Sequence, residues 1–333
     1  MKHSMRIFIT LSLLLIISSL LYLMIGSYRL SISDLGRIFI NQGTHLEQFV
    51  VFNLRLPRLL IVIAAGTALS VSGSIIQSVT GNDLADPGII GINAGAGLGV
   101  TLFFLQFGFT ASSFAFLLPI VAFGSGLLTA AIIFLLSNQK HQGINPSKMI
   151  LIGIGFSMAF SGLMVILISS ADRSNVAFIA SWLSGNIWGG NWRYVNVITP
   201  LIVGAFIVTY RLSNTINVIQ LGSDTATGLG VTLKKMHIIL LMLATLLASL
   251  AVSVVGNIAF LGLVAPHIAK QLIGRKNQVS LPMTALIGSL TLVIADLLAK
   301  NLIEPNGIPT GIVISIIGAP YFIYLLIKQT NPV

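Results

Sequence analysis

Residues 87–139 read PGIIGINAGAGLGVTLFFLQFGFTASSFAFLLPIVAFGSGLLTAAIIFLLSNQ, a stretch of 53 residues without one charged side chain. A helix needs about 20 mainly apolar residues to cross the hydrocarbon core of a bilayer. The stretch is therefore long enough for two membrane-spanning helices, and we expect the turn between them at Gly108 to Ser113. Soluble domains of ordinary composition do not contain such a stretch.

The rest of the chain repeats this pattern of apolar runs separated by isolated charges. Only 8% of the 333 residues are charged, against about 25% in soluble domains, and the mean hydropathy is +0.98. This composition excludes a soluble globular enzyme, and the apolar content excludes a disordered chain. The net charge of +10 comes from basic residues that flank apolar runs, as in membrane proteins. It does not indicate a surface that binds nucleic acid.

Ten segments are predicted to be transmembrane helices, which gives an all-α, polytopic membrane protein with one domain over residues 1–333. The segments are 7–26, 58–80, 89–107, 113–136, 148–169, 192–210, 236–255, 258–271, 280–300 and 309–328. The eighth is short, so we expect neighbouring protein to shield it, with a break before it at Gly256 and Asn257. Residues 174–192 are too polar to face lipid throughout and are predicted to form a short, partly buried or surface-lying helix. Trp182, Trp188 and Trp192 are interpreted as part of an aromatic belt at the membrane interface.

The distribution of basic residues predicts the orientation of the chain. Cations in short loops are more frequent on the cytoplasmic side of a membrane. With the N-terminus inside, 11 of the 18 Lys and Arg residues lie on the cytoplasmic side and seven on the outer side. Both termini are therefore expected in the cytoplasm, and the outer cations suggest an acidic partner or substrate.

Motifs for chemistry are missing from the sequence. There is no Walker loop for ATP, no zinc-protease HExxH, no hydrolase GxSxG and no cysteine. The histidines are too far apart in sequence to imply a metal site, so we expect no catalytic residue, no metal and no cofactor. Gly91, Gly95 and Gly99 recur every four residues, which predicts a face for close helix packing.

Asp296 is the one acidic residue within a predicted span. A charge at the centre of the bilayer is unfavourable by about 2.5–3.5 kcal/mol. We interpret Asp296 as lying near the outer end of its span, paired with Lys300 four residues later or with a backbone donor. As a proton relay it would instead indicate a proton-coupled secondary transporter, which we keep as an alternative function. His267 is interpreted as a hydrogen-bonded structural residue.

Residues 210–235 form the most unusual polar stretch, predicted to lie in the cytoplasm. Glycines at positions 222, 228 and 230 bracket small residues, which indicates two short helices joined by a tight turn. The composition is compatible with a solvated connector or with a docking surface for a cytoplasmic partner.

Several blocks of sequence, in order, carry a resemblance to a known family. They are Arg55-Leu-Pro-Arg58 with Gly66, Ser72-Gly73 and Gln77; Asn82-Asp-Leu-Ala-Asp-Pro-Gly88 with Gly91 to Gly97; Leu221 to Gly230; Gly256 to His267; and Ile308-Pro-Thr-Gly311-Ile312 with Gly318-Ala-Pro320. Together they resemble the FecCD-type permeases of ABC importers, which carry iron–siderophore complexes, haem or vitamin B12. The match covers nearly the whole chain.

The resemblance implies a vitamin B12 permease-like fold in the cytoplasmic membrane, with short coupling and outer-face helices. It implies a second permease subunit, identical or homologous, two cytoplasmic ATP-binding subunits and an extracytoplasmic substrate-binding protein. The expected function is import of an iron–siderophore complex by alternating access. Haem or vitamin B12 import by the same mechanism remains open.

The resemblance also assigns roles to residues of this sequence. Binding-protein docking maps to Arg55, Arg58 and Lys300, where the family often has Arg at the third position and Lys offers only a point charge. ATPase coupling maps to Leu221, Gly222, Thr225, Ala226, Leu229 and Gly230. The cytoplasmic gate maps to Asn82, Leu84 and Ser147. The pathway is expected at a dimer interface lined by the fifth span, with Gly153, Ser157 and Ser161 as candidates, although ordinary helix packing explains each of them equally well.

Overall fold

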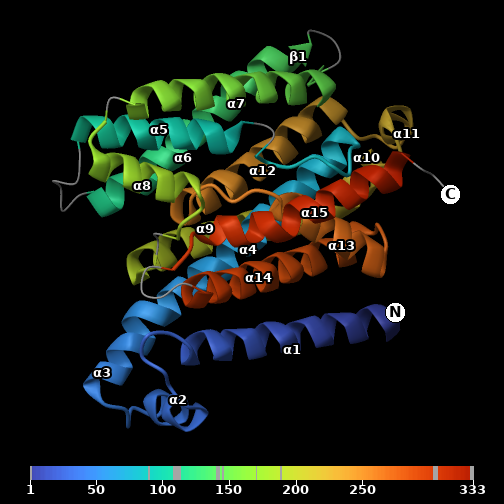
Figure 1. Cartoon of the computed structure of the whole chain (residues 1–333). Helices are drawn as coiled ribbons and strands as arrows, with labels where there is room; N and C mark the ends of the chain where they lie inside the picture. Colours follow the sequence, from blue (N-terminus) through green and yellow to red (C-terminus); the bar gives the residue numbers. More distant parts are fainter. Residues whose placement is uncertain are drawn as a thin grey trace.

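The computed structural model describes residues 2–88, 91–107, 114–139, 143–144, 146–169, 171–187, 190–302 and 307–330. Nearly all of this part is helical (Figure 1). Within it, the strands β1 (Asn138–Gln139) and β2 (Gly143–Ile144) form one short antiparallel pair. The predicted all-α class is therefore confirmed.

Helices occupy all ten predicted spans in the described part of the chain. They are α1 (Lys2–Met24), α4 (Leu56–Thr80), α5 (Ile92–Phe107), α6 (Phe114–Ser137), α7 (Pro146–Ser169), α9 (Trp192–Arg211), α12 (Leu233–Val255), α13 (Leu261–Ile273), α14 (Asn277–Leu302) and α15 (Thr310–Thr330). Eight of them are long and apolar enough to cross a membrane, whereas α5 and α13 are shorter apolar helices. The short eighth segment is thus confirmed, because α13 has 13 residues.

The breaks between helices follow the predicted positions where the structure describes them. α12 ends before Gly256, which has a φ of 71°, and Phe260 at the start of α13 also has a positive φ of 66°. The predicted turn at Gly108 to Ser113 lies outside the described residues, between the last residue of α5 and the first of α6. The polar segment forms the short helix α8 (Arg173–Leu183).

One interpretation from the sequence is wrong. Trp182 on α8 is fully buried, so it is not part of an interfacial belt. The backbone carbonyl of Trp182 lies against Gly256, in the break between α12 and α13. A Cβ atom at position 256 would lie only 2.6 Å from this carbonyl oxygen. The side chain therefore packs in the core beside this break. Trp192 is more exposed and donates a hydrogen bond to the Phe52 carbonyl (2.7 Å), and Trp188 lies outside the described residues.

The long helices run roughly parallel to one another, so the bundle has two ends (Figure 1). At the α2 end lie α2 (Ile32–Phe39) and α3 (His45–Gln48), each begun by a capping box, and the π-helix η1 (Phe49–Arg55) that continues into α4. At the α11 end lie α10 (Ser213–Ile219) and α11 (Ser223–Gly228). The first residues of α1 and the last residues of α15 are also at the α11 end.

α4 is the most buried long helix and forms the axis of the bundle. Two glycines allow its close packing. A Cβ added at Gly66 would lie 2.7 Å from the Gly288 carbonyl oxygen of α14, and one added at Gly73 would overlap the Gly262 backbone of α13. Because backbones meet at these points, α13 is shielded by α4 and α14, as expected for a helix too short to cross alone.

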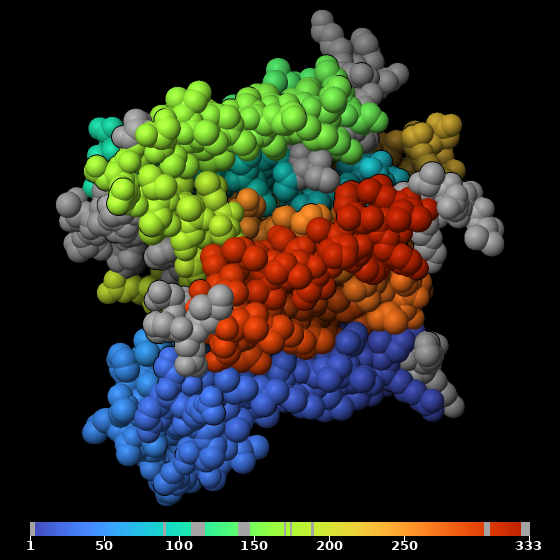
Figure 2. All heavy atoms as spheres, in the orientation of Figure 1, coloured from blue at the N-terminus to red at the C-terminus, as the bar shows by residue number. Residues whose placement is uncertain are grey.

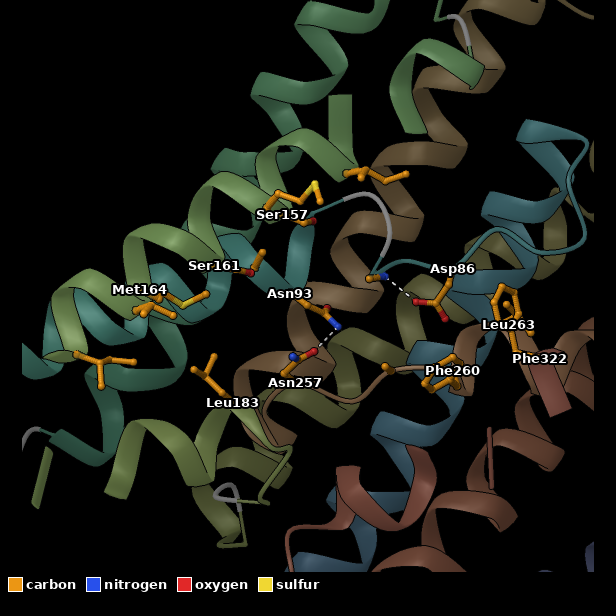
Figure 3. A pocket seen from close by; sticks show the side chains of 17 residues that line it. Asp86, Asn93, Ser157, Ser161, Met164, Leu183, Asn257, Phe260, Leu263 and Phe322 are labelled. Atoms are coloured by element: carbon orange, nitrogen blue, oxygen red, sulfur yellow. Dashed lines mark hydrogen bonds between the residues drawn. The ribbon is translucent and has the colours of Figure 1, made fainter. Parts of the chain in front are cut away.

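The predicted glycine face of α5 is also confirmed as a packing face. Cβ atoms added at Gly95 and Gly99 would overlap the side chains of Thr129 and Ser125 on α6. The spacing by four residues on both helices keeps these pairs in line along the contact. α5 is thereby held against α6, and Asn93 in its first turn points towards Asn257 in the break between α12 and α13 (Figure 3).

Candidate functional site

A cavity of about 990 Å³ at the α2 end is lined by Arg55, Arg58 and Lys300, the three residues predicted for docking. They come from η1, α4 and α14, which are far apart in sequence. Tyr22 of α1 and Asn186, which follows α8, line the same cavity. The structure therefore brings the predicted cations together around one opening.

A buried ion-pair network lies beneath this cavity. Arg58 donates two hydrogen bonds to Asp296, from Nε to Oδ2 (3.2 Å) and from Nη2 to Oδ1 (2.9 Å). Lys300 Nζ lies 3.3 Å from Asp296 Oδ2, Thr310 donates to Asp296 Oδ1 (2.7 Å), and Tyr22 donates its hydroxyl hydrogen to Oδ2. The carboxylate is fully buried. The predicted pairing of Asp296 with Lys300 is thus confirmed, whereas its contacts with Arg58, Thr310 and Tyr22 were not predicted from the sequence.

Arg55 is also engaged within the chain, although it lines the cavity. Its Nη1 donates to the carbonyl oxygens of Leu23 (2.7 Å) and Met24 (3.2 Å), and its Nη2 donates to that of Tyr28. Carbonyls neutralise no charge, so Arg55 keeps a full positive charge at the cavity. Arg58 and Lys300 share the single carboxylate of Asp296, so the positive charges around the opening outnumber the buried negative charge. The opening can therefore attract carboxylates of another molecule.

A second cavity, of about 730 Å³, lies between α7 and the pair α13 and α15 (Figure 3). Figure 2 shows the hollow between the surfaces of α7 and α15. Ser157 and Ser161 of α7 line it, as predicted, together with apolar walls. The wall residues include Met158, Met164, Val165, Phe260, Leu263 and Phe322. Gly153 does not line it, because Gly153 is buried beside the first turn of α5.

Polar groups form the floor of this cavity. Asn93 at the start of α5 donates a hydrogen bond to Asn257 Oδ1 (2.8 Å), in the break between α12 and α13. The Oδ1 atom of Asn93 is buried and has no hydrogen-bond partner among the described residues. Asp86 also lines the floor and accepts a hydrogen bond from the Gly88 backbone (2.7 Å). Sequence reasoning assigned no site role to these side chains, although Asp86 and Asn93 stand in the blocks that carry the family resemblance.

Burial dominates the electrostatics of Asp86. Its side chain lies almost entirely out of solvent, and this raises the pKa of the carboxyl to about 6, although backbone amides of Gly88 and Leu263 partly stabilise the charged form. Among the residues that the structure describes, Asp86 is therefore the one acidic group of the cavity floor. The other described lining residues contribute hydroxyls, amides and apolar surface.

Two predicted gate residues lie in the loop of residues 81–88, which we name the gate loop. Asn82 forms a tight turn, in which its Oδ1 accepts a hydrogen bond from the Leu84 backbone (2.9 Å) and its carbonyl oxygen one from the Ala85 backbone (3.1 Å). Leu84 follows within this turn. Ser147 is exposed in the first turn of α7.

The gate loop is held by a charge cluster that sequence reasoning missed. Asp83 accepts hydrogen bonds from Lys270 (2.7 Å), at the end of α13, and from Arg275 (2.9 Å), in the turn before α14. Lys270 also donates to Gln77 (2.8 Å) and is 8% exposed. Burial alone would raise the pKa of Asp83, but the hydrogen bond and charge of Lys270, with that of Arg275, lower it below its usual value.

His267 lies on the same short helix as Lys270. Its Nδ1 shares a hydrogen bond with the Tyr321 hydroxyl of α15 (2.8 Å). The predicted structural role of this histidine is confirmed.

Residues 210–235, which we name the coupling segment, contain the two predicted short helices α10 and α11. Gly222 and Gly230 adopt positive φ values of 104° and 85° on either side of α11. Leu221 and Leu229 are 63% and 62% exposed, whereas Ala226 is fully buried. The segment therefore presents two leucines, with Thr225 exposed between them, and Ala226 packs inward.

Comparison with known proteins places the chain among transport permeases. The model of the FecCD transport family matches residues 14–328. The iron(3+)-hydroxamate import system permease protein FhuG of Bacillus subtilis is 41% identical over 320 residues, which cover 95% of each chain. The Fe(3+) dicitrate transport system permease protein FecD of Escherichia coli is 34% identical, over 86% of this chain and 88% of its own.

A solved structure shares the architecture. A metal-chelate type ABC transporter in an inward-facing conformation superimposes with a TM-score of 0.83 at 30% sequence identity. The match covers 98% of this chain and 99% of that one. The arrangement of the helices is therefore that of a transporter permease.

Proposed function

The chain belongs to the FecCD transport family, and from this we propose that it is the transmembrane permease subunit of an ABC importer for an iron–siderophore complex. The family match over residues 14–328 is the observation that carries the proposal, and the cavity of about 730 Å³ beside α7 is proposed as the pathway. Relatives named for iron–hydroxamate and iron–citrate import support the cargo class. Haem and vitamin B12 are the alternative cargoes.

The cavity has the properties of a pathway rather than of a tight binding site. In the described part of the chain its walls are apolar, and polar side chains line it at the floor and at Ser157 and Ser161. A cargo in transit needs contacts that are weak enough to be released. Exposed apolar side chains of α7, such as Met158 and Val165, offer the surface on which a second permease subunit, identical or homologous, completes the pathway.

The α2 end is proposed to face the outside and to receive the substrate-binding protein. Arg55, Arg58 and Lys300 surround the opening there, and their positive charge steers acidic side chains of a partner. Alternating access then opens the pathway towards this end for loading and towards the α11 end for release.

The α11 end is proposed to face the cytoplasm, with both termini and two ATP-binding subunits. Leu221, Gly222, Thr225, Leu229 and Gly230 form the ATPase-facing part of the coupling segment, and Ala226 packs beneath them. Asn82, Leu84 and Ser147 are proposed as the cytoplasmic gate. Residues 1–333 thus act as one domain in the cytoplasmic membrane.

We also infer that the permease itself catalyses no reaction and needs no cofactor. Its family is one of transport permeases, and ATP is hydrolysed by the partner subunits. The energy for uptake therefore enters through the coupling segment.

Reconstitution in proteoliposomes tests this function. The chain is combined with its ATP-binding subunits, a second permease subunit and the binding protein, and uptake of a radiolabelled ferric hydroxamate is measured. Uptake should require ATP inside and binding protein outside. Concentrative uptake by the isolated chain, or uptake driven by a proton gradient alone, would contradict the proposal. ATP-dependent uptake of haem or vitamin B12, without uptake of ferric chelates, would show that the cargo is one of these molecules and not an iron–siderophore complex.

A further inference from the structure

Three amide side chains on one face of α10 contact the start of α14. Asn214, Asn217 and Gln220 are spaced by three residues, which places them on one side of the helix. Asn217 Oδ1 accepts hydrogen bonds from the backbone nitrogen (2.9 Å) and the side-chain amide (2.8 Å) of Asn277. Asn277 also donates to Gln220 (3.2 Å) and is 1% exposed. The coupling segment is therefore joined to the first residue of α14.

Further hydrogen bonds extend this contact. Asn217 donates to Gln278 (2.8 Å), Gln278 donates to Asn214, and Gln220 donates to Ser78 near the end of α4 (2.8 Å). The backbone nitrogen of Asn277 is one of the donors that a helix start leaves unpaired, so Asn217 caps α14. Separation of α10 from α14 would leave the buried amide of Asn277 without its partners Asn217 and Gln220, which is unfavourable. The two helices should consequently move together.

The gate loop is joined to the same place from the other side. Asp83, between the gate residues Asn82 and Leu84, binds Arg275, and Arg275 precedes Asn277 by two residues. Lys270 holds the second carboxylate oxygen of Asp83 from the end of α13. The intervening turn, Gly274–Lys276, has three residues and begins at a glycine with a φ of 86°. So short a turn cannot absorb a displacement of α14 without moving Arg275.

We propose that the turn Gly274–Lys276 transmits displacement of the coupling segment to the gate loop, with Asn217 and Asp83 as positioning residues on its two sides. The inference rests on the proposed function, because it assigns a task only within an ATP-driven permease. ATP-dependent movement of α10 shifts the start of α14 through Asn217 and Asn277. The same shift moves the gate loop through Arg275, Lys270 and Asp83.

A reversible cross-link tests the first half of this connection in the complete importer in proteoliposomes. The chain has no native cysteine, so Asn217→Cys with Asn277→Cys introduces the only pair. In the reduced form the hydrogen bonds are lost, and uptake per ATP hydrolysed should fall about tenfold. Oxidation should restore uptake in the same sample, because the disulfide replaces the lost bonds. A fold defect would not be repaired in this way.

Asp83→Asn tests the second half, because it removes the charge and keeps the size of the side chain. Uptake per ATP should again fall about tenfold, while ATP hydrolysis continues, and Asp83→Glu should retain most of the uptake. Asp34→Asn is the matched control, since Asp34 pairs with Arg37 at the α2 end, and it should behave as the wild type.

Normal coupling in both Asp83→Asn and the reduced cysteine pair would overturn the inference. Loss of uptake on oxidation would also overturn it, since the contact would then have to open during transport. A wild-type importer without ATP-dependent uptake would instead overturn the proposed function.

Discussion

Arg58 and Asp296 are 238 residues apart in sequence and form a two-pronged ion pair, with donor–acceptor distances of 2.9 and 3.2 Å. The pair joins the first turn of α4 to α14 beneath the cavity that Arg55, Arg58 and Lys300 line. Arg58 therefore stabilises the fold as well as contributing charge to the opening. A charge reversal at Arg58 would disrupt both the fold and the proposed docking surface, so the two roles need separate tests.

Asp296→Asn should destabilise the protein strongly. The substitution leaves Arg58 and Lys300 beside a buried site without an anion, and loss of one partner of a buried ion pair is unfavourable by about 3–5 kcal/mol. Chemical unfolding in detergent measures the change. Asp34→Asn, at a partly exposed ion pair of α2, keeps an oxygen for the capping hydrogen bond from the Ser31 backbone and should shift the unfolding transition far less. An unchanged transition in Asp296→Asn would show that the network contributes little.

Arg55→Gln should weaken association of the substrate-binding protein without unfolding the permease. The side-chain amide of Gln can still donate to some of the carbonyl oxygens that Arg55 contacts, but it carries no positive charge. One exposed charge pair contributes about 0.5–1 kcal/mol, so Kd should rise roughly two- to fivefold. Surface plasmon resonance should show a larger effect at low salt than at high salt. Lys234→Gln, at the α11 end, is the control. Equal affinities of the wild type, Arg55→Gln and Lys234→Gln for the binding protein would show that Arg55 is not part of the docking surface.

Ser161→Trp should block the pathway. Ser161 lines the cavity beside α7, and an indole there would occupy much of the space between α7 and α15. Uptake of the ferric chelate should fall to near background while ATP hydrolysis continues. Leu14→Trp, on the exposed face of α1, adds the same ring away from the cavity and should transport normally. Full uptake by Ser161→Trp would place the pathway elsewhere.

Leu221→Ser with Leu229→Ser should release the ATP-binding subunits. Both leucines are more than 60% exposed in the chain, so their replacement should not unfold it. An apolar anchor buried at an interface contributes about 2 kcal/mol, so the double variant should retain little ATPase in copurification. Leu46→Ser, 58% exposed at the opposite end, is the control. Undiminished copurification would exclude these leucines from the contact.

Much of the fold could be predicted because apolar run length limits where helices cross a membrane. The positions of α4 and α13, and the break at Gly256, follow from windows without charge and from one glycine. α2 and η1 were not located by this method, because charged residues at positions 34, 37, 47 and 55 leave no uncharged window of membrane-spanning length there. The burial of Trp182 was missed for a related reason, since aromatic residues near a span end occur in both belts and cores.

The candidate site could be predicted only where motifs marked it. Arg55, Arg58 and Lys300 do surround one opening, but their intramolecular partners are backbone carbonyls and a distant carboxylate that spacing does not show. The contacts of Asp83 join residues about 190 positions apart, and no local pattern predicts a contact across such a separation. Ala226 lies in the coupling motif, yet its orientation depends on how α11 packs.

Asp86→Asn should stabilise the protein at neutral pH and remove part of its pH dependence. Burial raises the pKa of Asp86 to about 6, so the native state holds this proton at pH values where the unfolded chain has lost it. Stability from this group is therefore greatest below the unfolded pKa of about 4, decreases as pH rises to about 6, and is constant above it. The full difference is at most about 3 kcal/mol. Unfolding in detergent at pH 5 and pH 8 should show a wild type that is relatively more stable at the lower pH, and an Asn variant that lacks this contribution while keeping an acceptor for the Gly88 amide. The same pH dependence in both proteins would mean that Asp86 is ionised in the fold across this range.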